Sequence, residues 1–393
     1  MGEDIPTPGA GTLGAGTLGV GMVGHAFMGT AHSQAWRTAG RVFDLPLAPV
    51  MVALCGRDRD RTAAAARRLG WAAVETDWKE LVRREDVALV DICTPGDSHA
   101  EIAIAALEAG KHVLCEKPLA NTVEEAVAMT AAAERARAHG VRAMVGFNYR
   151  RVPALALARQ LIADGRLGVI HHVRAAYLQD WLADPAFPLT WRLDRERAGS
   201  GALGDLGAHI VDLAQFLTGQ RLTGVCALTE TFVGQRPLPG GDGVGPVTVD
   251  DAALFLGRFT RGAVATFEAS RFATGRKNAL RIELNGSAGS VVFDLEALNV
   301  LQFHDHREDT ATAGFRRILV TEPTHPYLEA WWPPGHLLGY EHTFTHEVKD
   351  LVQAVGDGLD PAPSFADGLQ VQQVLASVER SASNGSGWEG IPQ

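Results

Sequence analysis

Residues 1–147 alternate short apolar runs with alanine-rich helical patterns, and this alternation constrains the fold more than any other feature of the sequence. Repeated strand–helix units of this kind form a parallel sheet with helices packed on both faces. We therefore predict an α/β domain at the start of the chain. Its expected strands are Thr17–Val23, Val50–Cys55, Ala88–Cys93, Lys111–Leu114 and Val141–Val145, and its expected helices are Thr30–Ala39, Arg59–Leu69, His99–Ala109 and Val123–Ala138.

From residue 148 onward the pattern changes to longer alternating runs separated by turn residues, which is typical of an antiparallel sheet. We expect a helix over Leu203–Leu217 that ends at Gly219, and a final helix over Asp367–Ser383. The expected strands are Ile170–Gln179, Gly224–Thr231, Ala252–Phe259, Ala263–Ala269, Ala279–Asn285 and Ser290–Asp294. The predicted parts are a flexible tail (1–14), the α/β domain (15–147), an α+β domain with a large open, mainly antiparallel sheet (148–365), and a C-terminal helix and tail (366–393) that returns toward the first domain.

The charge balance excludes some partners. The chain has 36 Lys and Arg against 46 Asp and Glu, a formal net charge of −10, and no basic block. This argues against nucleic acid and against anionic membranes as partners. The uncharged stretch Ile5–Trp36 follows acidic residues and is broken by glycines and prolines, so it predicts neither a signal peptide nor a membrane span.

The four cysteines form no CxxC pair and no disulfide framework. Three of them, Cys55, Cys93 and Cys115, follow apolar runs, where a small thiol side chain is ordinary core material. Unpaired cysteines of this kind are typical of a reducing compartment, so we expect a cytoplasmic protein.

A glycine-rich turn near the start has the spacing of a dinucleotide-binding fingerprint. G-x-G-x-x-G occurs three times within residues 9–24, but none of these matches has both a strand before it and a helix directly after it. A fourth, imperfect match, Gly24-His25-Ala26-Phe27-Met28-Gly29, follows the strand Thr17–Val23 and precedes the helix Thr30–Ala39. A pyrophosphate needs the helix N-terminus, so we place the cofactor here, with Ala26 where the middle glycine usually stands.

The end of the second strand bears on the choice between NAD and NADP. An acidic residue there hydrogen-bonds the adenosine ribose and favours NAD. This chain has Gly56 and Arg57 instead, followed by Asp58. Gly56 leaves space and Arg57 offers a partner for a 2′-phosphate, so the sequence leans toward NADP, while Asp58 keeps NAD open.

Further motifs follow two of the parallel strands, at the edge where such sheets bind ligands. They are Thr94-Pro95-x-x-x-His99 and Glu116-Lys117-Pro118, and a third, Gly204-Asp205-Leu206-Gly207-Ala208-His209, lies in the second domain. With the fingerprint, these residues resemble the glucose–fructose oxidoreductase and inositol dehydrogenase family (Gfo/Idh/MocA). Gly146–Arg150 and Ser364–Gly368 extend the resemblance over nearly the whole chain, and Tyr177–Trp181, Trp191-Arg192 and Gly199–Asp205 are similar to its levoglucosan dehydrogenase branch.

The resemblance implies a Rossmann domain followed by an α/β domain, with Lys117, Asp205 and His209 as the catalytic set. The residue types suit these roles. Asp205 and His209 are four residues apart on one predicted helix, so they share a face. A histidine accepts a hydroxyl proton near neutral pH, and a lysine polarises the reacting oxygen.

The remaining expected site residues divide between cofactor and substrate. Sugars pack their C–H faces on aromatic rings and need fixed polar partners for their hydroxyls. The expected cofactor-binding residues are Gly24, Ala26, Phe27, Met28, Gly29, Gly56, Arg57, Thr94, Pro95, His99, Glu116, Lys117, Trp191 and Arg192. The expected substrate-binding residues are Asn148, Tyr149, Gln179, Asp180, Trp181, Asp205 and His209. We expect no metal, because His342 and His346 have no third ligand at a suitable spacing.

The leading hypothesis is an NAD(P)-dependent dehydrogenase acting on a secondary alcohol of a sugar, sugar derivative or cyclitol. A redox-assisted glycosidase-type enzyme and a non-catalytic cofactor sensor of the same fold are the alternatives. We also expect a homodimer or homotetramer, because strands such as Ala252–Phe259 carry too little charge for two solvated faces.

Overall fold

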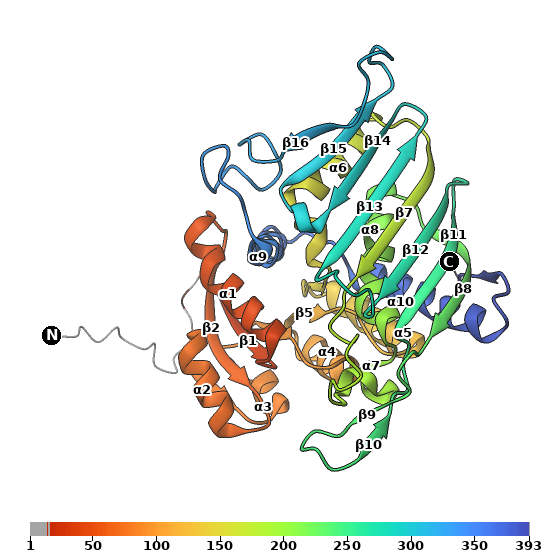
Figure 1. Ribbon diagram of the computed structural model, residues 1–393. Coiled ribbons are helices and arrows are strands. Elements are labelled where there is room, and N and C mark those ends of the chain that lie inside the picture. The colour runs from red at the N-terminus through yellow and green to blue at the C-terminus, as the bar shows by residue number, and fades with distance from the viewer. Residues whose placement is uncertain (1–13, 15, 393) are drawn as a thin grey trace. The chain divides into compact units, whose positions relative to one another are not determined.

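The computed structural model describes Gly14 and residues 16–392, and the chain forms two compact units (Figure 1). The first unit holds the described residues up to Leu119, together with Glu124–Gly146 and Glu341–Asp367. The second holds Ala120–Val123, Phe147–Tyr340 and the chain from Gly368 onward. Most of the predicted tail, residues 1–13, lies outside the described residues.

The first unit is built on a six-stranded parallel sheet with the order β3-β2-β1-β4-β5-β6. This is the doubly wound order of a Rossmann fold, in which the strand order reverses between β1 and β4. The strands are apolar and largely buried, as expected for a parallel sheet covered on both faces. They are β1 (Thr17–Val23), β2 (Ala48–Cys55), β3 (Ala73–Glu75), β4 (Leu89–Ile92), β5 (His112–Glu116) and β6 (Ala143–Gly146).

Four helices of the first unit each follow a strand and match the predicted ranges closely, so the predicted parallel α/β domain is confirmed. No range was predicted for the short edge strand β3 or for the helices Trp78–Arg83 and Tyr340–Asp357. The helices are α1 (Phe27–Val42), α2 (Arg59–Leu69), α3 (Trp78–Arg83), α4 (His99–Glu108), α5 (Val123–Arg137) and α9 (Tyr340–Asp357).

The C-terminal part of the chain contributes to both units, and the division does not fall at the predicted domain boundary. Helix α9 packs in the first unit, where Phe344 lies 5.4 Å from the ring of His32. The segment after α9 runs along the sheet edge, and Val145 N donates to Pro363 O at 3.1 Å. Helix α10 (Phe365–Ser383) contacts second-unit residues, for example through the Arg195–Glu379 ion pair at 2.8 Å. The C-terminal helix that we expected to return toward the first domain is α10, and it belongs mainly to the second unit, whereas α9 packs in the first unit.

The second unit is built on a nine-stranded sheet with the order β16-β15-β14-β13-β7-β12-β11-β8-β17. All neighbouring pairs are antiparallel except β7 and β12, so the predicted mainly antiparallel sheet is confirmed. The strands are β7 (Ile170–Leu178), β8 (Leu222–Glu230), β11 (Ala252–Phe259), β12 (Val264–Ser270), β13 (Ala279–Gly286), β14 (Gly289–Asp294), β15 (Val300–Asp305), β16 (Arg316–Leu319) and β17 (Glu389–Gly390). A separate hairpin pairs β9 (Gln235–Pro237) with β10 (Val244–Pro246).

Two helices, α6 (Pro153–Ala163) and α8 (Ala208–Thr218), pack on this sheet, and α7 (Arg195–Ala198) is a short turn of helix. The alternation of buried and exposed residues along β11 and β12 shows that only one face of the sheet is covered within the chain.

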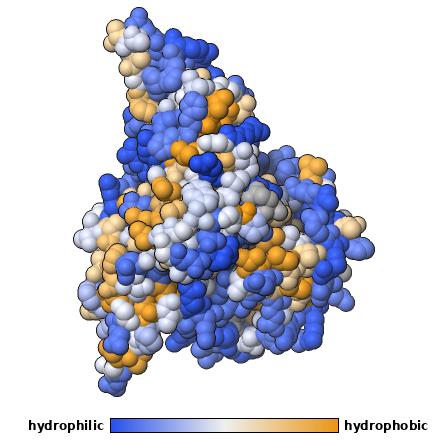
Figure 2. Space-filling view, turned by 90° about the vertical axis from the view of Figure 1, so that its right-hand side faces the viewer, coloured by the Kyte–Doolittle hydropathy of each residue, from blue (hydrophilic) through white to orange (hydrophobic). Residues whose placement is uncertain are grey.

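The surface drawn in Figure 2 carries several separate hydrophobic patches among hydrophilic side chains. No helix among the described residues has the length and apolar character that a bilayer crossing requires.

Candidate functional site

The fingerprint turn takes the register that the sequence predicts, and backbone geometry explains why. Gly24 has a φ of +99°, and a Cβ there would lie 2.7 Å from Cys93 O. A Cβ on Gly29 would lie only 2.2 Å from Gly24 O. Glycine is therefore required at both positions, the first for the left-handed turn and the second for close packing of α1 on that turn.

The N-terminus of α1 suits an anionic group. The helix begins after Ala26, whose side chain makes no capping hydrogen bond, and its first turn contains no acidic residue. Phe27 is 64% exposed at this end. Backbone N–H groups and the helix dipole therefore favour negative charge here, so these residues fit the pyrophosphate of a dinucleotide.

The space beside Gly56 is filled by protein. A Cβ on Gly56 would lie 2.5 Å from Thr62 Oγ1 and 2.7 Å from the His25 ring. Thr62 Oγ1 donates its proton to Asp58 O at 2.6 Å, so its 3.2 Å contact with His25 Nε2 places a proton on that nitrogen. The expectation that Gly56 leaves open space for a ribose phosphate is therefore wrong at this backbone geometry, because His25 and Thr62 occupy the space.

Asp58 and Arg57 have different surroundings. Asp58 is the N-cap of α2, and its Oδ1 accepts from Arg61 N at 3.0 Å. Arg57 is exposed, and the described residues offer it no polar partner. Asp58 therefore stabilises the N-terminus of α2, whereas the Arg57 side chain remains available to a ligand.

The loops after β4 and β5 are joined by His99. Its Nε2 contacts Thr94 O at 2.9 Å and its Nδ1 contacts Pro118 O at 3.0 Å. His99 is 1% exposed, so this ring holds the two loops together from inside the protein. Lys117, half-buried, stands in the second loop directly after Glu116 at the end of β5.

A buried cluster of charged side chains lies beneath these loops, and sequence reasoning missed it. His32 Nδ1 lies 3.0 Å from the Asp91 carboxylate, and His32 Nε2 lies 2.9 Å from Glu116 Oε1. Trp36 Nε1 also donates to Asp91 at 2.7 Å, and Lys117 N donates to Glu116 Oε2 at 3.1 Å. The available signal was the aspartate at the centre of an otherwise apolar strand, since a buried carboxylate needs partners.

The protonation of His32 follows from these partners. Burial lowers the pKa of the imidazole, but the Asp91 carboxylate and Cys93 raise it, so the net pKa lies well above its usual value. With a carboxylate oxygen facing each ring nitrogen, the imidazolium form satisfies both contacts. Ligand atoms of His32, Asp91 and Cys93 lie within 4.8 Å of one another, the one such group of three in the described chain. Their hydrogen bonds account for the cluster without a metal.

In the second unit, the predicted regular helix is divided, so that Asp205 lies on a π-helical turn and His209 lies in the first turn of α8. Residues Leu203–Gly207 form a π-helical turn, and α8 begins only at Ala208. Asp250 fixes this turn: its two carboxylate oxygens accept from Gly201 N at 2.6 Å and from Leu203 N at 2.8 Å. Such π-turns within helices are frequent at functional sites.

His209 is surrounded by aromatic rings. Its ring centroid lies 4.6 Å from Tyr149, 5.8 Å from Tyr177 and 6.2 Å from Phe147. Only 7% of His209 is exposed. Burial raises the pKa of Tyr149 to about 12 and raises that of Tyr177 as well, so both phenols keep their protons at neutral pH.

A line of polar groups continues from these tyrosines to residues predicted to bind substrate. The Tyr149 and Tyr177 hydroxyls lie 2.7 Å apart, and Tyr177 donates to Asn278 Oδ1 at 2.7 Å. Gln179 donates to the same oxygen at 2.6 Å and accepts from Trp181 Nε1 at 2.9 Å. Asn278 was not among the predicted site residues, because it lies in a turn far from every motif.

Other predicted residues have partners of their own. Asp180 accepts from Lys277 Nζ at 2.8 Å and from Gly275 N at 3.0 Å, and these bonds lower the pKa of its carboxyl. Asp180 therefore stabilises the neighbouring turn. The Arg192 guanidinium lies 4.5 Å from the ring of Trp191. Asn148 is buried in the short helix that also carries Tyr149.

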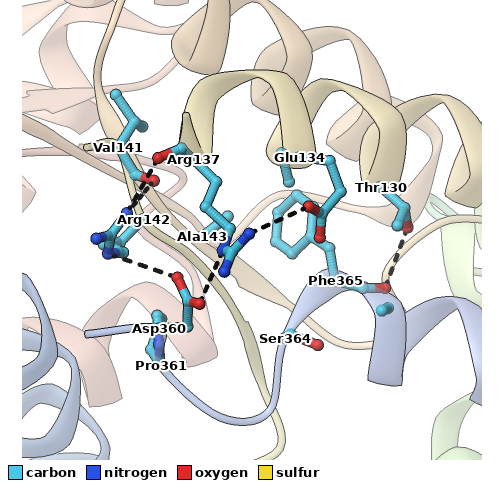
Figure 3. Close-up of a pocket in the computed structure, with 12 residues that line it drawn as sticks. Thr130, Glu134, Arg137, Val141, Arg142, Ala143, Asp360, Pro361, Ser364 and Phe365 are labelled. Atoms are coloured by element: carbon cyan, nitrogen blue, oxygen red, sulfur yellow. Dashed lines mark hydrogen bonds and ion pairs between the residues drawn. The ribbon is translucent and has the colours of Figure 1, made fainter. Parts of the chain in front are cut away.

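A cavity of about 360 Å³ lies between α5, the start of β6 and the segment after α9 (Figure 3). Its charged groups pair with each other: Arg137 Nε donates to Asp360 at 2.7 Å, and Arg142 Nε lies 3.7 Å from the same carboxylate. Next to it, Ser364 and Asp367 bond each other's backbone N–H groups in a capping box at the start of α10. The S-F-A-D-G motif is thus explained as a helix start.

The comparisons with known proteins agree with this geometry. Residues 18–147 match the family model of an oxidoreductase family with an NAD-binding Rossmann fold. Residues 155–292 match the family model of the GFO/IDH/MocA C-terminal domain. The chain is 42% identical over 380 residues to the levoglucosan dehydrogenase of Pseudarthrobacter phenanthrenivorans, which covers 93% of this chain and 96% of that protein.

Solved structures give the same result. The crystal structure of an oxidoreductase domain protein from Kribbella flavida superposes with a TM-score of 0.94. The two sequences are 66% identical, and the match covers 96% of this chain and 100% of that one. A levoglucosan dehydrogenase in complex with NADH and levoglucosan is 42% identical, with a TM-score of 0.92 and coverage of 96% and 100%.

The fold and the fingerprint turn define an oxidoreductase with a Rossmann-type NAD-binding domain. The chain belongs to the GFO/IDH/MocA family, as its motifs indicated. It is an NAD(P)-dependent dehydrogenase that acts on CH–OH groups.

Proposed function

We propose that this enzyme oxidises a secondary alcohol of a sugar, a sugar derivative or a cyclitol. The observation that carries the proposal is the cluster of His209 with two protonated tyrosines, since polar groups fixed among aromatic rings suit a polyol. Relatives named levoglucosan dehydrogenase and, at 27% identity, inositol 2-dehydrogenase of Rhizobium meliloti support this substrate class.

Three side chains carry the reaction in this proposal. His209 accepts the hydroxyl proton of the alcohol, and Asp205, in the π-helical turn directly before α8, holds His209 or a neighbouring substrate hydroxyl. Lys117 stabilises negative charge on the reacting oxygen. The nicotinamide cofactor supplies a hydride acceptor when bound. Gly24, Gly29 and the N-terminus of α1 hold its pyrophosphate.

A substrate screen tests the proposal. Levoglucosan, myo-inositol and D-glucose are each offered with NAD and with NADP, and the absorbance of the reduced cofactor is followed together with the product. Net reduction of cofactor with a ketone product is the expected result. Product from bond cleavage without net reduction would establish a redox-assisted glycosidase-type reaction instead, and binding of cofactor without turnover of any polyol would contradict the proposal.

The choice of cofactor is a separate proposal. We infer that Arg57 is the group that meets a 2′-phosphate, because it is exposed, lies two residues after the end of β2, and has no polar partner among the described residues. NADH complexes of the related levoglucosan dehydrogenase support use of NAD. We therefore expect an enzyme that uses both cofactors, in which Arg57 supports NADP.

We also propose that the uncovered face of the nine-stranded sheet joins copies of this chain. Leu228, Leu254 and Leu256 on this face are 63%, 46% and 51% exposed. They border a hollow of about 670 Å³ that also contains charged groups of both signs, Arg174, Glu268, Arg281 and Glu283. Apolar residues beside charges of both signs suit a self-complementary contact around a two-fold axis.

Sedimentation of the wild type and of Leu254→Glu/Leu256→Glu tests this assembly. The wild type should sediment as a dimer or tetramer at micromolar concentration, and the variant as a monomer. Val169→Glu is a suitable control, since Val169 is 62% exposed outside the hollow. A monomeric wild type would contradict the proposal.

The four cysteines support a reducing compartment, and we propose the cytoplasm. All four are free thiols, and Cys55, Cys93 and Cys115 are buried. Fractionation of the source cells should place the protein with cytoplasmic markers, and recovery with secreted proteins would contradict the proposal.

A further inference from the structure

His25 follows Gly24 in the fingerprint turn, and its ring occupies the space beside Gly56 at the end of β2. In Rossmann folds that bind NAD, an acidic side chain at this end of the second strand accepts a hydrogen bond from the 2′-hydroxyl of the adenosine ribose. A Cβ on Gly56 would lie 2.7 Å from both Cδ2 and Nε2 of the His25 ring. An imidazole therefore stands where the side chain of such an acid would begin.

The hydrogen bonds of His25 determine what its other ring nitrogen can do. Thr62 Oγ1 has one proton, which it donates to Asp58 O at 2.6 Å. In its 3.2 Å contact with His25 Nε2 this hydroxyl must therefore accept, so Nε2 carries a proton. A neutral imidazole has one N–H group and one nitrogen lone pair, which leaves the lone pair on Nδ1. No described residue forms a hydrogen bond with Nδ1, and the ring is only half-buried.

The neighbouring polar side chains are less suited to accept from a ribose hydroxyl. Asp58 Oδ1 accepts from Arg61 N at 3.0 Å, and Oδ2 lies 3.7 Å from Arg61 Nε. Arg57 has N–H donors only. Among the described side chains next to Gly56, His25 thus offers the acceptor that has no partner.

We propose that His25 Nδ1 accepts the hydrogen bond of the adenosine ribose 2′-hydroxyl, and that Thr62 is the positioning residue that keeps the lone pair on this nitrogen. The inference rests on the proposed binding of the dinucleotide at the fingerprint turn. NAD has a hydroxyl proton to donate here. The ionised 2′-phosphate of NADP has acceptor oxygens only, so it meets the same lone pair unfavourably. Neutral His25 therefore favours NAD, whereas Arg57 favours NADP.

The first experiment compares NADH with its 2′-deoxyadenosine analogue, in the wild type and in His25→Ala. Dissociation constants are measured from nicotinamide fluorescence at about pH 8, where a phosphate ester is ionised. Loss of one hydrogen bond should weaken binding of the analogue to the wild type by about tenfold. His25→Ala should bind NADH and the analogue equally. The 3′-deoxy analogue is the control, and its affinity relative to NADH should be the same in both proteins. A tenfold preference for NADH over the 2′-deoxy analogue that persists in His25→Ala would overturn the inference.

Two further variants identify which neighbour reads the ribose. Asp58→Asn keeps an oxygen that can cap α2, and it should retain the preference for NADH over the 2′-deoxy analogue. Loss of that preference in Asp58→Asn, with retention in His25→Ala, would assign the hydroxyl to Asp58 instead. NADPH should bind His25→Ala at least as tightly as it binds the wild type, and Arg57→Gln should weaken NADPH alone. Weaker NADPH binding in His25→Ala would contradict an acceptor at Nδ1.

The role of Thr62 is tested without cofactor. Thr62→Val keeps the volume and removes the oxygen that faces Nε2, whereas Thr62→Ser keeps a hydroxyl. Nitrogen-15 NMR of histidine-labelled protein at about pH 8 shows which ring nitrogen is protonated, and the His25 signals are those that disappear in His25→Ala. The wild type and Thr62→Ser should carry the proton on Nε2, and Thr62→Val should show both tautomers and bind NADH more weakly. A wild-type proton on Nδ1 would overturn the inference, and a Thr62→Val variant identical to the wild type would overturn the part of Thr62.

The outcomes also separate this inference from the proposal beneath it. A wild type that binds no NADH would overturn the proposed dinucleotide site together with the role of His25. A wild type that binds NADH, with a preference over the 2′-deoxy analogue that does not depend on His25, would overturn the role of His25 alone.

Discussion

The two units reach their candidate site residues by different routes. In the first unit the fingerprint, the Thr94 loop and Lys117 each directly follow a strand, β1, β4 or β5. All strands of a parallel sheet end at the same edge, so short motifs are gathered there by the topology itself. In the second unit Tyr149, Tyr177 and Asn278 come from a short helix, a strand and a turn. An antiparallel sheet has no common carboxyl edge, so only the folded structure brings such residues together.

The units also differ in the charge they bury beneath these residues. The first unit buries an ionic cluster of His32 with Asp91 and Glu116, which needs every partner present. The second surrounds the His209 ring with Phe147, Tyr149 and Tyr177, whose phenols keep their protons at neutral pH, and it also buries the Arg150–Asp212 ion pair. Disrupting the first unit should therefore mainly cost stability, and disrupting the second should mainly change substrate binding and turnover.

The largest expected effect concerns the ionic cluster. His32→Gln leaves two buried carboxylates without a cation and should lower the free energy of unfolding by about 3–5 kcal/mol, measured by urea denaturation. Adding Glu116→Gln removes one of these charges and should recover part of the loss. A loss below about 1 kcal/mol would show that the cluster is not ionic and would weaken the contrast between the units.

The pH dependence of this effect has a defined sign. The fold raises the pKa of His32, so protonated His32 contributes to the free energy of unfolding. This contribution is fully present at a pH below about 6.5, the ordinary pKa of histidine, and is lost as the pH rises through the pKa of His32 in the folded state. The stability difference between wild type and His32→Gln should therefore narrow at alkaline pH. A difference that widens there would contradict an imidazolium between Asp91 and Glu116.

Catalysis should depend on one side chain from each unit. Lys117→Ala and His209→Ala should each lower kcat by about 10²-fold or more, which corresponds to about 2.7 kcal/mol, while the circular dichroism spectrum and NADH binding remain. Glu101→Ala, on an exposed face of α4, is a control that should leave kcat unchanged. Near-normal turnover in both active-site variants would remove the catalytic assignment.

The fingerprint turn gives a smaller, steric effect. Gly29→Ala should cost about 2 kcal/mol of stability and weaken NADH binding, because its Cβ meets the carbonyl oxygen of Gly24. Gly40→Ala on the same helix meets only the Pro49 ring, at 3.2 Å, and should be close to neutral. Equal effects of the two substitutions would show that the turn does not need close packing.

The smallest expected effect concerns cofactor choice. Arg57→Gln should reduce kcat/KM for NADP relative to NAD by about tenfold, or 1.4 kcal/mol, if the guanidinium pairs with the 2′-phosphate. Arg59→Gln, two residues further on, should leave the ratio unchanged. Gly56→Asp is a poor substitute for this test, because its Cβ must displace His25 or Thr62. An unchanged ratio in Arg57→Gln would show that Arg57 does not face the phosphate.

Sequence reasoning predicted the first unit well because its signals are local. The apolar run Thr17–Val23 coincides with β1, and Arg59–Leu69 coincides with α2. The register of the fingerprint was also predictable, since only one match has a strand before it and a helix after it. The same reasoning failed beside Gly56, because whether space is open depends on where the His25 ring lies.

The sequence alone determined most of the longer strands and helices, the register of the fingerprint glycines, and which motifs follow which strands, because these depend on periodicity and backbone sterics over a few residues. The tertiary structure decided the rest. It set His32 between two carboxylates that are 59 and 84 residues away, fixed the π-turn of Asp205 through Asp250, and brought Asn278 to Tyr177. Contacts between distant segments depend on how sheets and helices pack, and no local pattern in the sequence records that packing.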